Sequence, residues 1–395
     1  FGSRSRTIPR RRSRAGARAR AGAAMATVKY RGRVMEAYQH PAVRDRNGEL
    51  SGDSDAGPDA EELVDRGHAL GVLRRDGMEL QGMPKAARRD RELVEEAVRQ
   101  NGLALQFASP ELQRCRVLAA EACRSRGAVL AFLSPELQRD PEVVLEAVRQ
   151  DGLALAHASE ELRADADVAE DAVGQDWRAI ELVAEELHDH RPLVLLAVKG
   201  NWKALGFASE RLTGDREIVR TAIAQDWLAI SHAAEELKAD PEVVREAVSK
   251  SWRALHFACD ELKADPELVR VAVEQNGSAL EHAAESCRAD RGLVLEAVRR
   301  SGRALEFAAP HLRADREVAL AAASNDRGAL LHAGEALLLD RDFMLEAVRL
   351  DGMAIEYAAE SLKHDRALLA EATRKDFRAL DHAGLDLRQD VAMLV

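Results

Sequence analysis

A 25-residue pattern recurs along most of the chain without insertions, and it limits what the chain can fold into. A unit of this length cannot bury an apolar face by itself, so its stability must come from stacking against the next unit. The pattern therefore indicates one continuous array instead of the two or three globular domains that 395 residues would suggest. Its most constant position is an alanine, found at Ala97, Ala122, Ala147, Ala172, Ala197, Ala222, Ala247, Ala272, Ala297, Ala322, Ala347 and Ala372.

Each unit has the signals of two short helices, as the segment Asp140–Leu162 illustrates. Asp140 and the proline after it predict a helix start, because Asp caps free N–H groups and Pro fits the first turn. Apolar residues then follow at i, i+3 and i+4, which predicts one buried helical stripe. Gly152 predicts the end of this helix, since Gly adopts the backbone conformation of a tight helix end. The sequence thus predicts an all-α solenoid of about twelve 25-residue helix–turn–helix units.

The composition agrees with a helical chain. Aromatic residues make up only 4% of it, and no apolar run approaches the ~18 residues that would span a bilayer. Four cysteines are too few for a disulfide scaffold in a chain this long, which suggests a reducing compartment such as the cytoplasm. Cys123 and Cys287 replace apolar repeat positions, so we expect both to be buried.

The residue two positions after each Leu or Ile of the second helix varies with a longer period than 25 residues. From Phe207 to His382, aromatic residues and histidines alternate strictly there, which favours a true repeat of 50 residues. These features resemble the DUF4116 family, whose repeats of about fifty residues contain D-[RP]-x-V-V-x-x-A-V and A-L-x-[FYH]-A-[SA]-x-x-L. The resemblance covers Asp90 to Gln389. It implies a tandem repeat array and transfers no catalytic residues, because the family defines none.

The same pattern divides the chain into segments. We expect a degenerate first repeat at 65–89, the DUF4116-like solenoid at 90–389, and the start of a truncated further repeat at 390–395. Residues 25–64 are rich in Asp, Gly and Ser and are typical of a flexible acidic linker.

Residues 1–24 contain eight arginines and no acidic residue, so the rest of the chain is more acidic than the net charge of -11 suggests. Three interpretations stay open for this segment: translated upstream sequence before Met25, an organelle-targeting leader, or a basic arm for nucleic acid or anionic lipid.

No phosphate-binding loop, dinucleotide fingerprint, zinc motif or nucleophile elbow occurs, and the carboxylates are periodic where a catalytic pair would be singular. The alternating histidines are at least one repeat apart, which is too far for them to converge on one metal ion. We favour a structural role for them, in the contacts between units, over a pH-sensitive role. We therefore expect no enzyme activity, no catalytic residue, no cofactor and no metal site.

The tryptophans are the most informative irregularity. All four occupy the repeat position where most other units have Gly, in four consecutive units, and basic residues follow three of them. Two interpretations compete: Trp fills a seam between units, or Trp beside a cation forms a strip that binds a partner. The candidate partner-binding residues are Trp177, Trp202, Trp227, Trp252, Arg178, Lys203 and Arg253.

These observations favour a non-enzymatic scaffold that binds another protein, because a solenoid presents a long continuous surface. A second hypothesis is an accessory or targeting region of a larger enzyme or effector whose catalytic domain is absent from this chain. Nucleic-acid binding is disfavoured, because an acidic repeat body would repel phosphates.

Overall fold

The structure is a computed structural model that describes residues 65–384 and Leu387. The expected basic leader at 1–24, acidic linker at 25–64 and truncated repeat at 390–395 lie outside the described residues. The repeats belong to one compact unit, Glu62–Val395.

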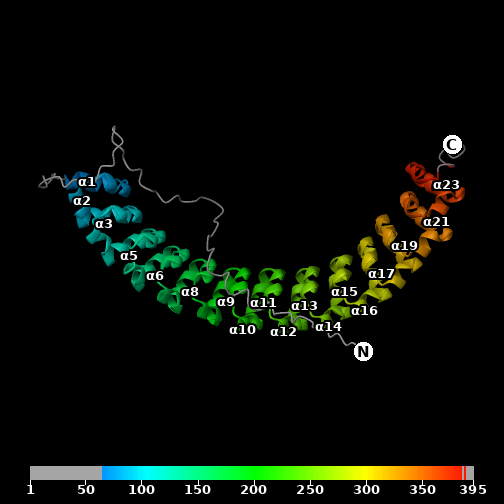
Figure 1. Cartoon of the computed structure of the whole chain (residues 1–395), viewed down its shortest axis with the longest axis horizontal. Coiled ribbons are helices and arrows are strands. Elements are labelled where there is room, and N and C mark those ends of the chain that lie inside the picture. Colours follow the sequence, from blue (N-terminus) through cyan, green and yellow to red (C-terminus); the bar gives the residue numbers. More distant parts are fainter. Residues whose placement is uncertain (1–64, 385–386, 388–395) are drawn as a thin grey trace, which may run out of the picture. The chain divides into compact units, whose positions relative to one another are not determined.

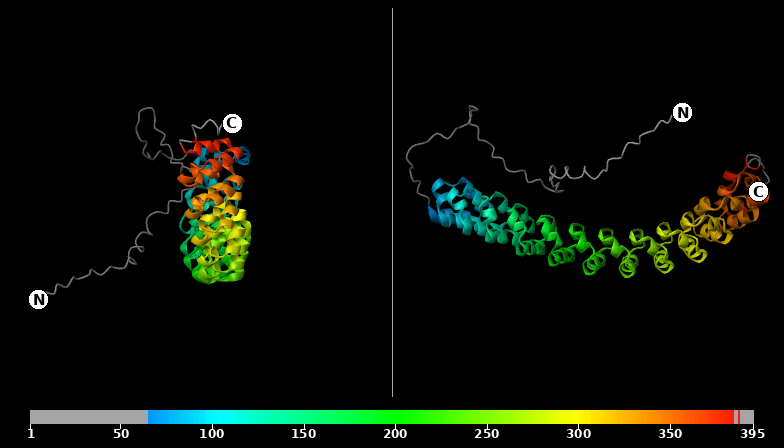
Figure 2. Two further views of the ribbon diagram at one scale, coloured as in Figure 1. Left: turned by 90° about the vertical axis from the view of Figure 1, so that its right-hand side faces the viewer. Right: turned by 60° about the horizontal axis from the view of Figure 1, so that its bottom comes forward.

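The array is all-α, as predicted, and the described residues contain no strand. Its repeats follow one another along a curved line, with the long helices toward the inner side and the short helices toward the outer side (Figure 1). Two further views show the same single row of stacked helices (Figure 2). Within the part of the chain that is described, no helix is long and apolar enough to cross a bilayer.

Each unit has three helical pieces where the sequence pattern predicted two. A long α-helix of mostly ten residues is followed by a 3-10 helix and then by a single short turn of helix. The second predicted helix is divided because the backbone is extended between the last two pieces, as at Ala158 and Ser159, whose ψ angles are 157° and 160°.

Three types of helix alternate along the array. The long helices are α1 (Arg66–Leu73), α3 (Arg91–Gln100), α5 (Arg116–Ser125), α6 (Pro141–Gln150), α8 (Ala166–Gln175), α9 (Arg191–Gly200), α11 (Arg216–Gln225), α13 (Pro241–Lys250), α15 (Pro266–Gln275), α17 (Arg291–Arg300), α19 (Arg316–Asn325), α21 (Arg341–Leu350) and α23 (Arg366–Lys375). The 3-10 helices that follow them are η2 (Gly77–Gly82), η3 (Gly102–Phe107), η4 (Gly127–Phe132), η6 (Gly152–His157), η7 (Trp177–Glu181), η9 (Trp202–Phe207), η10 (Trp227–His232), η11 (Trp252–Phe257), η12 (Gly277–His282), η13 (Gly302–Phe307), η14 (Arg327–His332), η15 (Gly352–Tyr357) and η16 (Phe377–His382). The short pieces are α2 (Lys85–Arg89), α4 (Pro110–Gln113), η5 (Leu137–Arg139), α7 (Glu160–Arg163), η8 (Glu185–Asp189), α10 (Glu210–Thr213), α12 (Glu235–Lys238), α14 (Asp260–Lys263), α16 (Glu285–Arg288), α18 (Pro310–Arg313), α20 (Glu335–Leu339) and α22 (Glu360–Lys363).

The long helices begin as the sequence predicts. The carboxylate of Asp140 accepts hydrogen bonds from the N–H groups of Glu142 and Val143, and the equivalent aspartates of most other units do the same. Each cap satisfies N–H groups that have no partner within the helix. Most units can therefore start their own helix, whatever lies before them in the chain.

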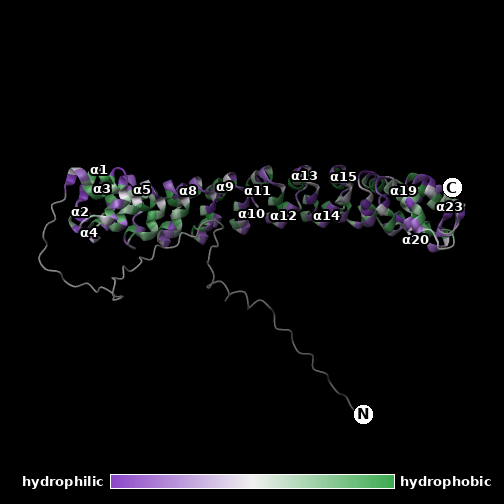
Figure 3. Ribbon diagram, turned by 90° about the horizontal axis from the view of Figure 1, so that it is seen from above, coloured by the Kyte–Doolittle hydropathy of each residue, from purple (hydrophilic) through white to green (hydrophobic). Residues whose placement is uncertain are grey.

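The core is a continuous row of small apolar side chains. Ala147 and its counterparts are buried, with the valines, leucines and isoleucines on either side of them. Hydrophobic residues accordingly run along the whole array and are not gathered in one place (Figure 3). Every unit thus shares its core with both neighbours, which is the stacking that the repeat length requires.

Arginine at the first position of a long helix links successive units. Arg291 pairs with Asp315 at 2.9 Å and also with Glu317, so the aspartate that caps α19 is bound by the preceding unit as well. Arg191 binds Asp215 in the same way, at 2.8 Å. The carboxylates that the sequence analysis assigned to helix caps therefore also join neighbouring units.

Glycine at the start of the 3-10 helices permits close packing. A Cβ atom on Gly277 would lie 2.1 Å from the carbonyl oxygen of Ala297 in the next long helix, and one on Gly302 would lie 2.6 Å from that of Ala322. Real Cβ atoms do not approach an oxygen so closely. The sequence-based explanation of Gly152 was wrong, because its φ angle is outside the left-handed region and the requirement is close approach to Ala172.

Candidate partner-binding site

The four tryptophans lie at equivalent places, each as the first residue of the 3-10 helix that follows a long helix. The glycines of the other units are buried at this position, whereas all four Trp residues are partly exposed. Trp cannot fit against a neighbouring carbonyl as Gly does. The long helices α11 and α13, at the Trp227 junction, pack along less of their length than α5 and α6, whereas α8 and α9, at the Trp177 junction, pack as extensively as α3 and α5 at a glycine junction.

Three of the Trp rings pack against an aromatic ring or an imidazole of the next unit. The centroid of Trp202 lies 6.2 Å from that of His232, and Trp227 lies 6.4 Å from Phe257. Trp252 stacks on His282 at 5.8 Å with an angle of 23° between the rings. Three of the rings that alternate in the sequence are therefore partners of these three tryptophans, and the seam-filling interpretation describes one side of Trp202, Trp227 and Trp252.

Two of the three basic neighbours lie over the Trp rings. The Arg253 guanidinium carbon is 4.7 Å from the centroid of Trp252, and Lys203 Nζ is 5.9 Å from that of Trp202. Cations at these distances are attracted by the negative face of the ring. Arg178 differs, because its guanidinium forms an ion pair with Asp176 at 3.0 Å. In the third Trp unit the equivalent residue is Leu228, which is 37% exposed.

A glutamine from the next unit holds the backbone in place at this position. The N–H of Trp202 donates to Gln225 Oε1 at 2.9 Å, and Gln225 Nε2 donates to the carbonyl of Val198 at 2.5 Å. Gly152 and Gln175 form the first of these bonds at a glycine junction, at 2.7 Å. This hydrogen bond from the backbone N–H to the glutamine side chain, called the glutamine clamp below, is therefore common to both junction types. The Trp ring is an addition to it.

The histidines near the tryptophans pack against other rings. His256 lies 5.0 Å from both Phe257 and His282, measured between ring centroids. Burial lowers the pKa of His282; the negative charge of Glu281 opposes this shift, and the positive charges of neighbouring groups add to it. Near neutral pH this imidazole is accordingly uncharged and packs as an aromatic ring.

The repeat pattern seen in the geometry also identifies the family. A model of the family described as "Domain of unknown function (DUF4116)" matches residues 90–138, 140–188, 190–238, 240–288, 290–338 and 340–388. The chain belongs to the DUF4116 family. The matched segments confirm the expected 50-residue repeat, each containing two of the 25-residue units. No curated protein matches the chain at a significant level.

The four cysteines of this DUF4116 array are free thiols. Cys123 and Cys287 are buried, as expected from the apolar positions that they replace. Burial raises the pKa of the Cys123 thiol to about 12, so it is protonated and unreactive at physiological pH. Among the described residues, no group of three or more His, Cys, Asp or Glu side chains is arranged to hold a metal ion.

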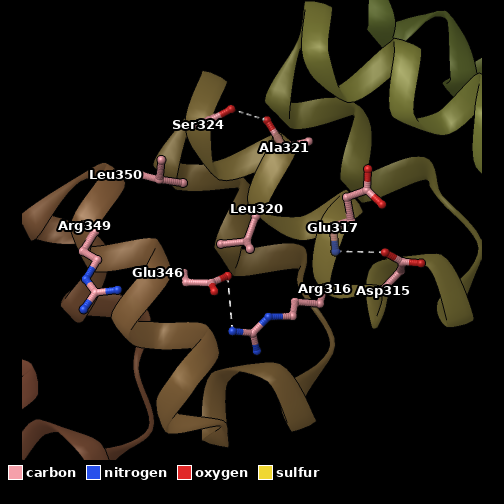
Figure 4. A pocket seen from close by; sticks show the side chains of 9 residues that line it. All are labelled: Asp315, Arg316, Glu317, Leu320, Ala321, Ser324, Glu346, Arg349 and Leu350. Carbon is pink, nitrogen blue, oxygen red and sulfur yellow. Dashed lines mark hydrogen bonds and ion pairs between the residues drawn. The ribbon is translucent and has the colours of Figure 1, made fainter.

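A second irregular surface of the DUF4116 array is the groove between α19 and α21 (Figure 4). It is open, has a volume of about 840 Å³, and exposes apolar atoms of Leu320 and Leu350. Arg316 crosses it to bind Glu346 at 3.2 Å. Two of the residues that line the groove, Ala321 and Ser324, have small side chains. In the α6 unit the equivalent residues are Glu146, which Arg124 binds at 2.8 Å, and Arg149, which binds Asp171 at 2.8 Å. The groove lies where these longer side chains are replaced. Sequence reasoning did not identify it.

Proposed function

We propose that this DUF4116 array is a non-enzymatic scaffold that binds a protein partner along the Trp strip, defined as Trp177, Trp202, Trp227 and Trp252 with Arg178, Lys203 and Arg253. The observation that carries the proposal is that four consecutive junctions expose part of a tryptophan where the buried glycines of other units expose nothing. Trp and Arg are the residues most often found at the energetic centres of protein interfaces.

The cations indicate the chemistry of the partner. Within the described part of the chain, Lys203 and Arg253 form no ion pair that would compete with a ligand, and each lies over its Trp ring. A carboxylate of the partner could approach either cation while an apolar side chain covers the exposed part of the ring. The strip therefore suits a segment that alternates acidic and apolar side chains.

The experiment compares capture of partners from a lysate by the full chain and by a charge-reversed variant, Lys203→Glu with Arg253→Glu. Arg303→Glu is the matched control, because Arg303 is exposed and occupies the same repeat position after Gly302. We expect the double variant to capture its partner about tenfold less well at ~0.15 M salt, and the control to be unchanged. Helical circular dichroism should be the same for all three proteins.

Equal loss in the control and the double variant would show a general charge effect and contradict the Trp strip. Unchanged capture by the double variant would contradict it as well.

A further inference from the structure

A single backbone hydrogen bond links almost every pair of neighbouring units. It runs from the N–H of the residue before each short helix to a carbonyl near the end of the preceding short helix, as from Ser159 to Gln138 at 3.0 Å. The same bond joins Ser109 to Arg88, Ala184 to Arg163, Ser209 to His188, Ala234 to Thr213, Cys259 to Lys238, Ala284 to Lys263, Ala309 to Arg288, Gly334 to Arg313, Ala359 to Leu338 and Gly384 to Lys363.

One link in this series is missing from the described residues. The N–H of Ser134 does not bond to the carbonyl of Gln113, and neither group has another partner in the described structure. Leu133 occupies a position where neighbouring units have a smaller alanine, Ala108 or Ala158. Its side chain is three carbons larger and needs more room at this seam, and we attribute the missing link to it.

A pocket of about 410 Å³ lies at the open seam, between α4 and η4. Leu133, Val129 and Leu103 provide an apolar wall, and Phe132 at its edge is 65% exposed. Gln113 cannot fill the space, because its side-chain amide donates to the carbonyls of Gln106 and Ala108 at 2.7 and 3.0 Å. In the described link series, this is the place where both residues of an interrupted link, Gln113 and Ser134, line a cavity.

The charges around the pocket are balanced. Arg114 lines the pocket, and its positive charge acts on two nearby carboxylates, Glu111 and Glu136. A strongly charged ligand would have to displace these interactions, so the pocket favours a neutral one.

We propose that this pocket binds a short extended segment of a partner chain, with neutral apolar side chains, through the N–H of Ser134 and the carbonyl of Gln113. An extended peptide supplies an acceptor and a donor from its own backbone, which is what the interrupted link lacks. The volume accommodates only a few residues and excludes a helix, whose diameter is about 10 Å. Phe132 and Leu133 then contact an apolar side chain of the segment. This site is separate from the Trp strip and does not depend on its function.

The probe for this proposal is an arrayed library of apolar tetrapeptides, acetylated and amidated so that neither end is charged. The full chain should bind some members of the library. N-methylation of the bound peptide's backbone should weaken binding about tenfold or more, because it removes the donors that the interrupted link requires. Equal binding of the N-methylated peptide would overturn the proposal, as would the absence of any ligand tighter than about 1 mM.

Two variants of the chain test the same site. Leu133→Ala should form the missing link, weaken peptide binding at least about tenfold and slow amide exchange at Ser134 by a similar factor. Leu153→Ala, in the closed neighbouring unit, is the control and should change neither measurement. If Leu133→Ala does not fold, Phe132→Ala alters an exposed side chain and should still weaken binding. Unchanged peptide affinity in a folded Leu133→Ala or Phe132→Ala protein would overturn the proposal.

Discussion

The junctions built on glycine and those built on tryptophan solve the same packing problem at different separations. At Gly277 the next long helix comes so close that a single carbon atom would collide with a carbonyl oxygen 2.1 Å away. At Trp227 the same backbone position carries the largest side chain, which reaches across to Phe257. The glutamine clamp occurs at both kinds of junction. The comparison shows that this position can hold either the smallest or the largest side chain, because the glutamine clamp, the helix caps and the ion pairs do not involve that side chain.

The largest effect is expected where a side chain is forced into a tight junction. Gly277→Ala should lower the free energy of unfolding by about 3 kcal/mol, because the new Cβ must push Ala297 and its helix away. Urea unfolding measures the change. Gly174→Ala is the control: its Cβ would meet only Leu196, at 3.9 Å, and the helical site should gain about 0.5–1 kcal/mol. If both variants behave alike, close approach is not the reason for glycine at position 277.

An intermediate effect is expected when a wide junction loses its ring. Trp227→Gly should cost about 2 kcal/mol, less than a fully buried Trp would, because the ring is partly exposed. Faster hydrogen exchange in α11 and α13 should accompany the loss. A cost near zero would mean that the junction closes to the glycine spacing once the ring is removed, so that the ring sets the separation without adding stability.

The smallest effect concerns the ion pairs, which span both kinds of junction. Bonding to Arg191 lowers the pKa of Asp215, and bonding to Arg291 lowers that of Asp315. Both carboxyl groups have a lower pKa in the folded than in the unfolded chain, so their contribution is complete above about pH 4 and is lost as the pH falls through the folded value.

Arg191→Ala and Arg291→Ala should each reduce stability at pH 7 only slightly, as the loss of an exposed ion pair does, and flatten the loss of stability below about pH 4. Urea unfolding between about pH 3 and pH 7 tests this. A clear difference between the two variants would show that the pair at the Trp202 junction and the pair at the Gly302 junction are not equivalent.

Local sequence signals predicted what depends on local chemistry. Asp140 was identified as a helix cap and Cys123 as a buried apolar replacement, because each follows from residue type and spacing alone. The contact of Trp252 with His282 was not predicted, although both positions were noted, because it joins residues from different units. Nor could the sequence show that Arg178 forms an ion pair with Asp176, since the nearest carboxylate is decided by side-chain geometry.

The role of Gly152 marks the limit of local reasoning most clearly. A glycine after a helix is commonly required by its own backbone, and that explanation was wrong for Gly152. The actual constraint comes from Ala172 in the next unit, a distance that only the stacked structure defines. The open seam at Leu133 is a similar case, because one alanine-to-leucine difference has its effect on a hydrogen bond between units.

The ion pair between Arg291 and Asp315 has a consequence for how the gene can change. The arginine of one unit binds the cap of the next, and the tryptophan of one unit accepts either a phenylalanine or a histidine ring from the next, so these contacts depend only on relative position. Recombination that removes or inserts one whole unit in register would keep these relative positions. A deletion of a few residues would misalign every contact at that junction. Copy number can therefore vary across generations far more freely than the length of any single copy.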